Sequence, residues 1–228
     1  MVPLMKTALI VVLAVACGDP PRPAPVFRVW PALGATMSAA AWGTDTAWIG
    51  RALDAVRDTV DRPRPAVAFD ALRREIRGRT GVAVAAEDVK EGAALDRAAR
   101  VLAAVVDSAL FDLGGQFLWI GSRGTRRVVG IADPANSLVA LATVELREGS
   151  VSTSASVTVL APSGLAAEAW SRALSRVRCD SALALARRPE ARRVSLVCAD
   201  SSGVRWTPDL DGRVLVPRPN GFPRSRVP

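Results

Sequence analysis

The sequence predicts an α+β fold: one compact domain in which mostly antiparallel strands pack against helices. Two observations lead to this prediction. Stripes of apolar residues at helical spacing alternate with short apolar segments bounded by Gly, Pro, Asn and Ser. Several of the short segments also follow one another without an intervening helix, which is typical of antiparallel neighbours. Hydrophobic residues make up 50% of the 228 residues, enough for a sizeable core.

The N-terminal residues predict an export signal and a tether that precede the domain. Residues 1–16 combine the cation Lys6 with an apolar segment too short to span a bilayer, as in a signal peptide. Cys17 follows a lipobox-like run of small residues, so we expect lipidation at Cys17 and a lipid-anchored protein of the cell envelope or periplasm. Residues 17–26 are Pro-rich and predict a stiff tether. The alternative is an ordinary cleaved signal peptide with a chance cysteine.

The domain itself is expected over residues 27–213, and its first half mixes one hairpin with helices. The apolar spacing predicts the following elements in order: a hairpin over 27–42, a helix that begins at Asp45 or Thr46 and ends before Arg62, a short helix through Phe69, Leu72 and Ile76, a strand over 82–84, and a helix over 91–106.

The second half of the domain is predicted to be richer in strands. The expected elements are strands over 108–113, 117–120, 127–131, 138–146 and 157–160, a helix capped by Ser163, a short helix capped by Asp180, and a closing strand over 194–197. Residues 214–228 are rich in Pro and Arg, so we expect a disordered tail there.

Composition excludes several functional classes. The chain has no histidine, which rules out His-based general acid–base chemistry, Ser-His-Asp triads and His-ligated zinc, so that any metal would be held by oxygen. The net charge of +8 comes from scattered arginines that do not alternate with stacking aromatic residues. We therefore expect no nucleic-acid partner.

Two cysteines remain once Cys17 is assigned to the lipid. Cys179 and Cys198 could form a disulfide in an oxidising compartment. The other interpretation, that both are small buried hydrophobic residues, is the one that the sequence alone favours.

Several short motifs follow one another in an order that points to one family. They are ALGAT at 32–36, EGAALDRAARVL at 91–102, SALFDLGG at 108–115, VGIADP at 129–134, SVSTSAS at 150–156 and the run VTVLAPS before AEAWSRAL at 167–174. Over residues 27–211 this order resembles the FAD:protein FMN transferase (ApbE) family, of which the chain would be a shortened and divergent member.

The resemblance implies an activity. It implies Mg²⁺-dependent cleavage of the substrate FAD and transfer of the FMN half to a Thr or Ser of an envelope protein. A divalent cation would neutralise charge on the diphosphate, and small-residue turns would let backbone N–H groups approach the phosphates. The alternative is a catalytically inactive ApbE-like lipoprotein that serves as a binding or structural module.

The resemblance also assigns residues. Leu33 stands where the family's flavin-contacting Met lies. The other expected flavin or phosphate contacts are Gly34, Asp112, Gly114, Gly115, Thr153 and Ser154. Glu168 replaces an Asp that holds the metal, and no residue is assigned as catalytic. Taken singly, the glycines also suit simple turns, and Thr153 and Ser154 suit an ordinary strand and turn.

The chain departs from the family pattern at charged positions. Arg172 stands where the family has a Thr whose hydroxyl would ligate Mg²⁺. A positively charged side chain therefore stands next to the expected position of the metal ion. Glu91 stands where the family has Lys, although Lys90 is adjacent. Segments that line the flavin site in the family are missing, which predicts a smaller or more open site.

Overall fold

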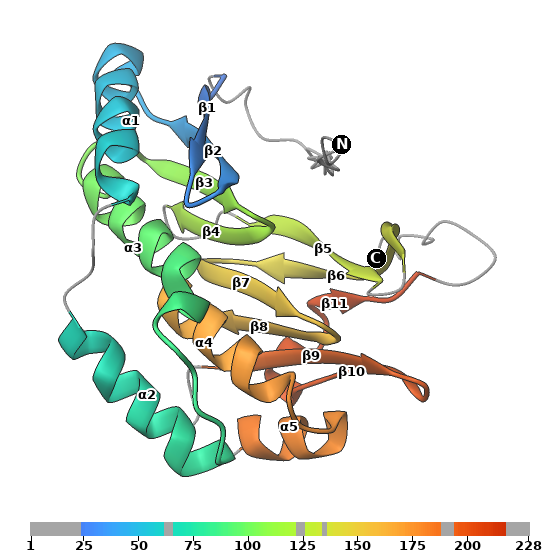
Figure 1. Cartoon of the computed structure of the whole chain (residues 1–228). Helices are drawn as coiled ribbons and strands as arrows, with labels where there is room; N and C mark the ends of the chain where they lie inside the picture. The colour runs from blue at the N-terminus through green and yellow to red at the C-terminus, as the bar shows by residue number, and fades with distance from the viewer. Residues whose placement is uncertain (1–23, 62–65, 122–125, 134–135, 188–193, 218–228) are drawn as a thin grey trace, which may run out of the picture.

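The computed structural model describes residues 24–61, 66–121, 126–133, 136–187 and 194–217. The predicted α+β fold is confirmed. Eight strands form one sheet in the order β1-β2-β3-β4-β7-β8-β9-β10, and three more form a second sheet in the order β11-β6-β5. Every pairing between neighbouring strands is antiparallel. Figure 1 shows α1, α3 and α4 following one another along one side of the large sheet.

The elements have these bounds. The strands are β1 Val26–Ala32, β2 Ala35–Trp42, β3 Ser108–Leu113, β4 Gln116–Gly121, β5 Arg127–Asp133, β6 Asn136–Leu146, β7 Gly149–Ser154, β8 Val157–Ala161, β9 Ser195–Asp200, β10 Gly203–Trp206 and β11 Val214–Leu215. The helices are α1 Thr46–Val60, α2 Ala66–Thr80, α3 Lys90–Leu102, α4 Gly164–Leu174 and α5 Cys179–Ala186, with short 3₁₀ turns at Glu87–Val89 and Pro208–Leu210.

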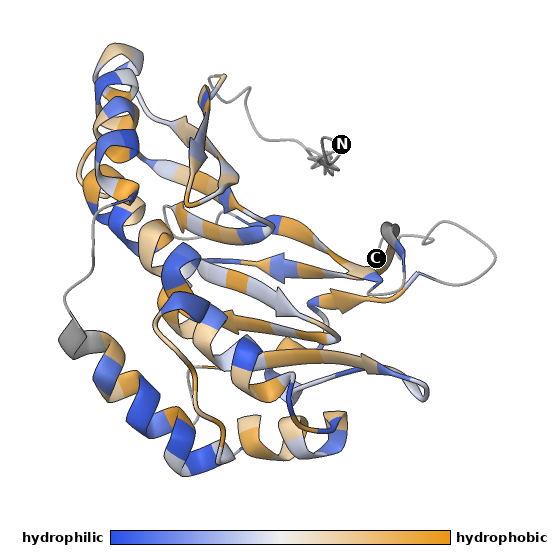
Figure 2. Ribbon diagram, in the orientation of Figure 1, coloured by the Kyte–Doolittle hydropathy of each residue, from blue (hydrophilic) through white to orange (hydrophobic). Residues whose placement is uncertain are grey.

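The large sheet is buried on both faces because its strands alternate between two cores. Along β3, Phe111 and Leu113 pack with α1 and α3, whereas Leu110 packs on the opposite side with the second sheet. Trp119 of β4 also faces the second sheet, where the Arg127 guanidinium stacks 4.3 Å from its ring centre. Figure 2 shows the result as orange bands along the central strands and mixed blue and orange helices.

Two of the predicted helix caps are confirmed and one is wrong. Asp45 accepts a hydrogen bond from the Trp48 N–H at 2.8 Å and caps α1, and Ser163 accepts one from the Ala166 N–H at 3.2 Å and caps α4. The predicted cap at Asp180 is wrong, because Asp180 lies inside the first turn of α5 and Arg178 takes the cap position without a side-chain hydrogen bond.

Three further predictions need correction. Residues 82–84 form no strand and instead lead into the 3₁₀ turn, where the Arg176 guanidinium donates a hydrogen bond to the Ala83 carbonyl at 3.0 Å. The helix expected over 91–106 ends at Leu102. The strand expected to close the domain, β9, is followed by β10 and β11.

Residues on both sides of the expected domain belong to strands: Val26, the last residue of the expected tether, begins β1. Val214 and Leu215, the first residues of the expected tail, form β11 and pair with Val144 and Thr143 of β6. The predicted signal peptide, Cys17 and most of the tether lie outside the described residues. Within the part of the chain that the structure describes, no helix is long and apolar enough to cross a membrane.

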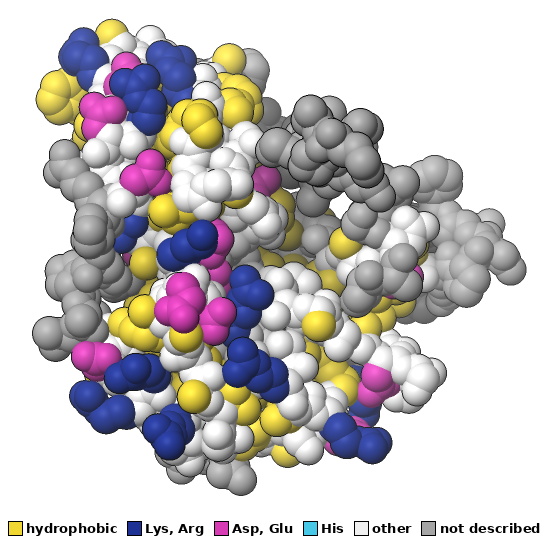
Figure 3. All heavy atoms as spheres, viewed as in Figure 1, with side chains coloured by type: hydrophobic (Ala, Val, Ile, Leu, Met, Phe, Trp, Pro, Cys, Tyr) yellow, Lys and Arg dark blue, Asp and Glu magenta, His cyan; other side chains and the backbone are white. Residues whose placement is uncertain are grey.

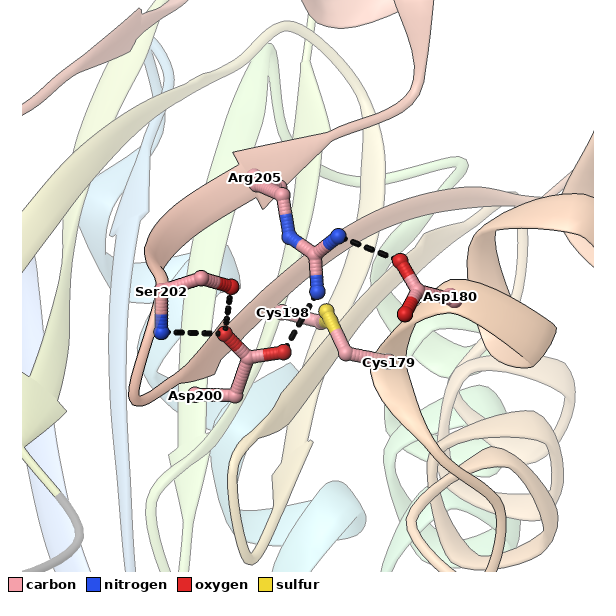
Figure 4. The surroundings of a disulfide bond; sticks show 6 residues. All are labelled: Cys179, Asp180, Cys198, Asp200, Ser202 and Arg205. Atoms are coloured by element: carbon pink, nitrogen blue, oxygen red, sulfur yellow. Dashed lines mark hydrogen bonds and ion pairs between the residues drawn. A yellow bond between two sulfur atoms is a disulfide. The ribbon is translucent and has the colours of Figure 1, made fainter.

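The interpretation of Cys179 and Cys198 as free buried residues is wrong, because the two form a disulfide between α5 and β9 with their Cα atoms 6.0 Å apart. Figure 4 shows Arg205 beside this disulfide, bridging Asp180 and Asp200. Hydrogen bonds from Ser202 hold the pKa of Asp200 below its usual value, with a smaller contribution from Arg205. We call α5, β9 and β10 with these residues the C-terminal corner.

Candidate functional site

The N-terminal ends of α3 and α4 touch at two glycines, and this contact organises the site. A Cβ atom added to Gly92 would lie 2.2 Å from the Gly164 carbonyl oxygen, and one added to Gly164 would lie 2.4 Å from the Gly92 carbonyl oxygen. Only glycine allows two backbones to approach this closely. We call this contact, together with Asp96, Gln116 and Glu168 around it, the helix crossing.

Side chains from α3 and β4 complete the helix crossing. The Asp96 carboxylate accepts hydrogen bonds from the Gly164 and Leu165 N–H groups at 2.6 and 3.1 Å, so it satisfies two of the free amides at the start of α4. The Gln116 amide, buried on β4, donates to the Gly164 carbonyl at 2.7 Å. The start of α4 is therefore fixed by hydrogen bonds from both a helix and the sheet.

Glu168, the predicted metal ligand, lies on the buried side of α4. Its residue surface is 3% exposed, and its carboxylate accepts the Gly92 N–H at 2.7 Å. Burial, followed by a hydrogen bond with the Glu91 carboxyl group, raises the pKa of Glu168 to about 8. Near neutral pH the Glu168 carboxyl group therefore tends to keep its proton.

The residues around Glu168 do not fit a divalent cation. The Arg172 guanidinium lies 3.9 Å from the Glu168 carboxylate, so a metal there would face a fixed positive charge. The carboxylate oxygen that accepts from Gly92 is already used, and the other is the one that faces Arg172. Among the described residues, no three Asp, Glu, Cys or His side chains gather into a metal-binding group.

The predicted flavin and phosphate contacts lie at one end of the large sheet. Leu33 and Gly34 form the β1–β2 turn with φ angles of 52° and 81°, so Leu33 adopts a backbone conformation that usually requires glycine. The Leu33 N–H donates to Asp61 at 3.2 Å, and the Lys90 ammonium donates to the Leu33 carbonyl at 3.3 Å. Lys90 therefore links this turn to the start of α3.

The Gly114–Gly115 turn joins β3 to β4 at the same end. Both glycines have positive φ angles, of 62° and 87°. The Gly114 N–H lies 3.5 Å from the Thr36 carbonyl oxygen, which places this turn next to the β1–β2 turn. Asp112 accepts the Gly115 N–H at 3.0 Å, and burial raises its pKa despite that hydrogen bond. Asp112 thus stabilises the turn.

Thr153 and Ser154 lie near the same end but point to opposite faces of the sheet. The Thr153 hydroxyl bonds the Thr158 hydroxyl at 2.9 Å and faces the second sheet, in a crevice also lined by Ile131. The Ser154 hydroxyl bonds the Ser175 hydroxyl at 3.2 Å, beside the end of α4. The structure therefore brings Ser154, and not Thr153, to the helix-covered face that carries Glu168.

Figure 3 shows this helix-covered side, where Lys and Arg side chains are spread among Asp and Glu side chains. A groove of about 520 Å³ lies beside the helix crossing and shares Asp96 with it. It is lined by apolar residues of β4 and α4 and by Asp96, Arg100 and Glu148. None of the sequence-predicted site residues lines this groove.

Sequence reasoning missed the residues that hold the site together. Gly92, Gly164 and Asp96 carry no signal by themselves, because each gains its role from a contact with a distant part of the chain. Gln116 follows directly on Gly114–Gly115 and sits at the buried start of β4, where a polar residue in an apolar strand is the one clue that the sequence offers.

The fold and this site define a class of protein: an antiparallel α+β domain in which glycine turns and a helix start meet at one end of the sheet. Residues 31–156, more than half of the chain, match the model of the ApbE family. The chain belongs to the ApbE family. No curated protein sequence matches it.

Solved structures of low sequence identity share the fold. A mutant of flavin transferase ApbE from Vibrio cholerae is 11% identical, with a TM-score of 0.63 over 83% of this chain and 99% of that one. Apo flavinyl transferase ApbE from Pseudomonas stutzeri is 15% identical, with a TM-score of 0.61 over 86% and 99%. The ApbE protein of Thermotoga maritima is also 15% identical, with a TM-score of 0.58 over 83% and 99%.

Proposed function

We propose that this protein is an exported, lipid-anchored flavin transferase that moves the FMN half of FAD to a Thr or Ser hydroxyl of another envelope protein. The observation that carries the proposal is the convergence, in an ApbE-family chain, of Leu33–Gly34, Gly114–Gly115 and the Lys90 end of α3 at one end of the sheet. The solved neighbours named flavin transferases support the same activity.

The reaction requires one bond exchange at phosphorus. The hydroxyl oxygen of the acceptor attacks the phosphorus of the FMN half, and the bond from that phosphorus to the bridging oxygen breaks. AMP leaves with the bridging oxygen, and the hydroxyl proton is released. Negative charge grows on the departing phosphate, so cations and backbone N–H groups near the diphosphate would lower the barrier. Lys90, Arg172 and the glycine turns are the groups that could supply them.

A metal ion at Glu168 would be repelled by the Arg172 guanidinium, which lies 3.9 Å from the carboxylate. The proposed reaction therefore uses the cations of this chain in place of Mg²⁺.

The cellular location in the proposal is supported by two features. The Cys179–Cys198 disulfide suits an oxidising compartment outside the cytosol. The apolar segment before Cys17 and the Pro-rich tether after it suit export and lipidation.

A second function is favoured by one specific observation. Because Arg172 and Glu91 surround Glu168 in place of a metal, the chain could hold flavin nucleotide, or act as a structural module, without transferring FMN. This alternative predicts no covalent product.

The test is a transfer assay with residues 18–228. The protein is incubated with FAD and an acceptor protein that carries a Thr motif, and covalent flavin is read by in-gel fluorescence. The flavin transferase from Vibrio cholerae, assayed in parallel with Mg²⁺, shows that the acceptor is competent. A fluorescent acceptor band supports the transferase. If only the control produces a band, the transferase proposal fails and the non-catalytic alternative remains.

A further inference from the structure

The charged groups beside the helix crossing suit an anion better than a cation. Lys90 begins α3, and its ammonium reaches the Leu33 carbonyl of the turn. Arg172 lies on α4 next to Glu168, which in turn contacts Glu91 at the start of α3. Lys90 and Glu91 are consecutive residues, so the start of α3 contacts the flavin-side turn through Lys90 and the Glu168–Arg172 pair through Glu91.

The start of α4 is not available to a phosphate. A helix N-terminus commonly binds phosphate through its free N–H groups. Here the Asp96 carboxylate accepts the Gly164 and Leu165 N–H groups, and Ser163 accepts that of Ala166. An anion at this site must therefore be met by side-chain cations rather than by the helix.

Arg172 is suited to that role. Its side chain is 46% exposed, and its separation of 3.9 Å from Glu168 is too long for a charge-assisted hydrogen bond. The guanidinium makes no hydrogen bond to any residue within the described ranges. Its planar set of N–H donors matches the geometry of phosphate oxygens, which a point charge such as Lys matches less well.

We propose that Arg172 takes the place of a divalent cation in this chain: its guanidinium, assisted by Lys90, binds the diphosphate of a flavin dinucleotide directly, so that the protein binds FAD without metal. The proposal rests on the proposed function, since it specifies how the same site holds its substrate. It explains why a buried carboxyl group and an arginine stand together where a metal does not fit.

Binding is measured separately from transfer. FAD is titrated into residues 18–228 and followed by flavin fluorescence, once in EDTA and once in excess Mg²⁺. The variants are Arg172→Gln, which removes the charge, and Arg172→Thr, which adds a hydroxyl. Arg176→Gln is the matched control, because Arg176 follows one turn later, is 53% exposed and contacts Asp88 and Ala83 instead. Circular dichroism verifies that each variant is folded.

The expected result is that the unaltered protein binds FAD equally well in EDTA and in Mg²⁺. Both Arg172 variants should raise the Kd in EDTA by about tenfold or more, as expected for loss of a bidentate phosphate contact, and Arg176→Gln should change it less than about twofold. FAD binding that needs Mg²⁺, or that is unchanged in Arg172→Gln, would overturn the inference and leave the transferase proposal standing.

Two further outcomes separate the proposals. Metal-free binding that depends on Arg172, without a covalent product in the transfer assay, would support the inference and refute the transferase. An absence of FAD binding under both conditions would overturn both.

Discussion

The helix crossing and the C-terminal corner both attach a helix to the large sheet, but they do so by different means. At the crossing, α3 and α4 meet through two glycine backbones, and hydrogen bonds from Asp96 and Gln116 fix the contact. At the corner, a disulfide joins α5 to β9, and exposed ion pairs of Arg205 surround it. The first attachment depends on shape, and the second on a covalent bond.

The two regions also differ in their position relative to the residues that match the family. The α3 side of the crossing lies within residues 31–156, which match the family, and carries Lys90 beside the site. The corner lies wholly beyond those residues and holds none of the predicted site residues. We infer that the crossing sets the geometry of the site, whereas the corner contributes stability.

Gly92→Ala should have the largest effect on the free energy of unfolding, because the new side chain would lie inside the helix crossing. The new methyl group would lie 2.2 Å from the Gly164 carbonyl oxygen and 2.8 Å from the Leu165 nitrogen, so two helices must move apart. Overpacking of this kind against backbone should cost at least about 3 kcal/mol of unfolding free energy. Urea unfolding followed by circular dichroism measures the change.

Gly78→Ala is the matched control for this substitution. Gly78 lies inside α2, and a Cβ atom there meets nothing within 4 Å. The change should stabilise the protein by about 0.5 to 1 kcal/mol through helix propensity. If both alanine variants behave alike, the crossing is not a tight backbone contact.

Loss of the disulfide should rank second and should leave the crossing intact. The bridge closes a loop with a sequence separation of 19 residues, and such a loop is worth about 3 kcal/mol. A reductant should therefore lower the urea midpoint of the unaltered protein. The double variant Cys179→Ser and Cys198→Ser should have the lower midpoint from the start and show no response to reductant. FAD affinity should stay the same in both, and a loss of affinity would contradict the division between site and corner.

The pH dependence of stability should be the most gradual of the three effects, and Glu168 carries the part of it that belongs to the crossing. The folded-state pKa of Glu168 is about 8, above its usual value near 4.5, so the folded protein holds a proton that the unfolded chain releases. Stability should therefore be greatest below about pH 4.5 as far as this group is concerned. It should decrease as pH rises toward 8, by at most about 5 kcal/mol, because each pKa unit between the folded and unfolded states corresponds to about 1.4 kcal/mol.

The pH effect is measured as the melting temperature between pH 5 and pH 9. Glu168→Gln keeps the shape of the side chain and removes its titrating group, so its melting temperature should change less over this range than that of the unaltered protein. A Gln variant that retains the full slope would show that another group is responsible.

The sequence predicted most elements of the fold because their apolar spacing is regular, but it missed β7. The inward positions of β7 are Ser150 and Ser152, so the alternation of apolar and polar residues that reveals a strand is absent. The hydroxyl groups of these serines can be buried because they form hydrogen bonds with partners outside the strand. Ser150 bonds to Phe117 and Gln116, and Ser152 bonds to Ser171 of α4. A polar strand face can be recognised only when its partner helix is known.

The turns around the candidate site could be predicted from the sequence, and the contacts that hold its helices together could not. Gly34, Gly114 and Gly115 are residues that signal turns in a sequence. The structure places them at positive φ in turns at one end of the sheet. The contact between Gly92 and Gly164 brings together two helices that are far apart along the chain, with the strands β3 to β8 between them. No local sequence pattern indicates such a contact. Local conformation could therefore be predicted, and long-range proximity could not.

The disulfide has a consequence for proteolysis at the C-terminal corner. A cut anywhere between Cys179 and Cys198 would leave the two fragments covalently joined, with β9 still paired to β8 on one side and β10 on the other. Such a nicked molecule would migrate as one chain until it is reduced, and it would keep the edge of its sheet in place. The corner would therefore keep its structure even when one of its peptide bonds is cut.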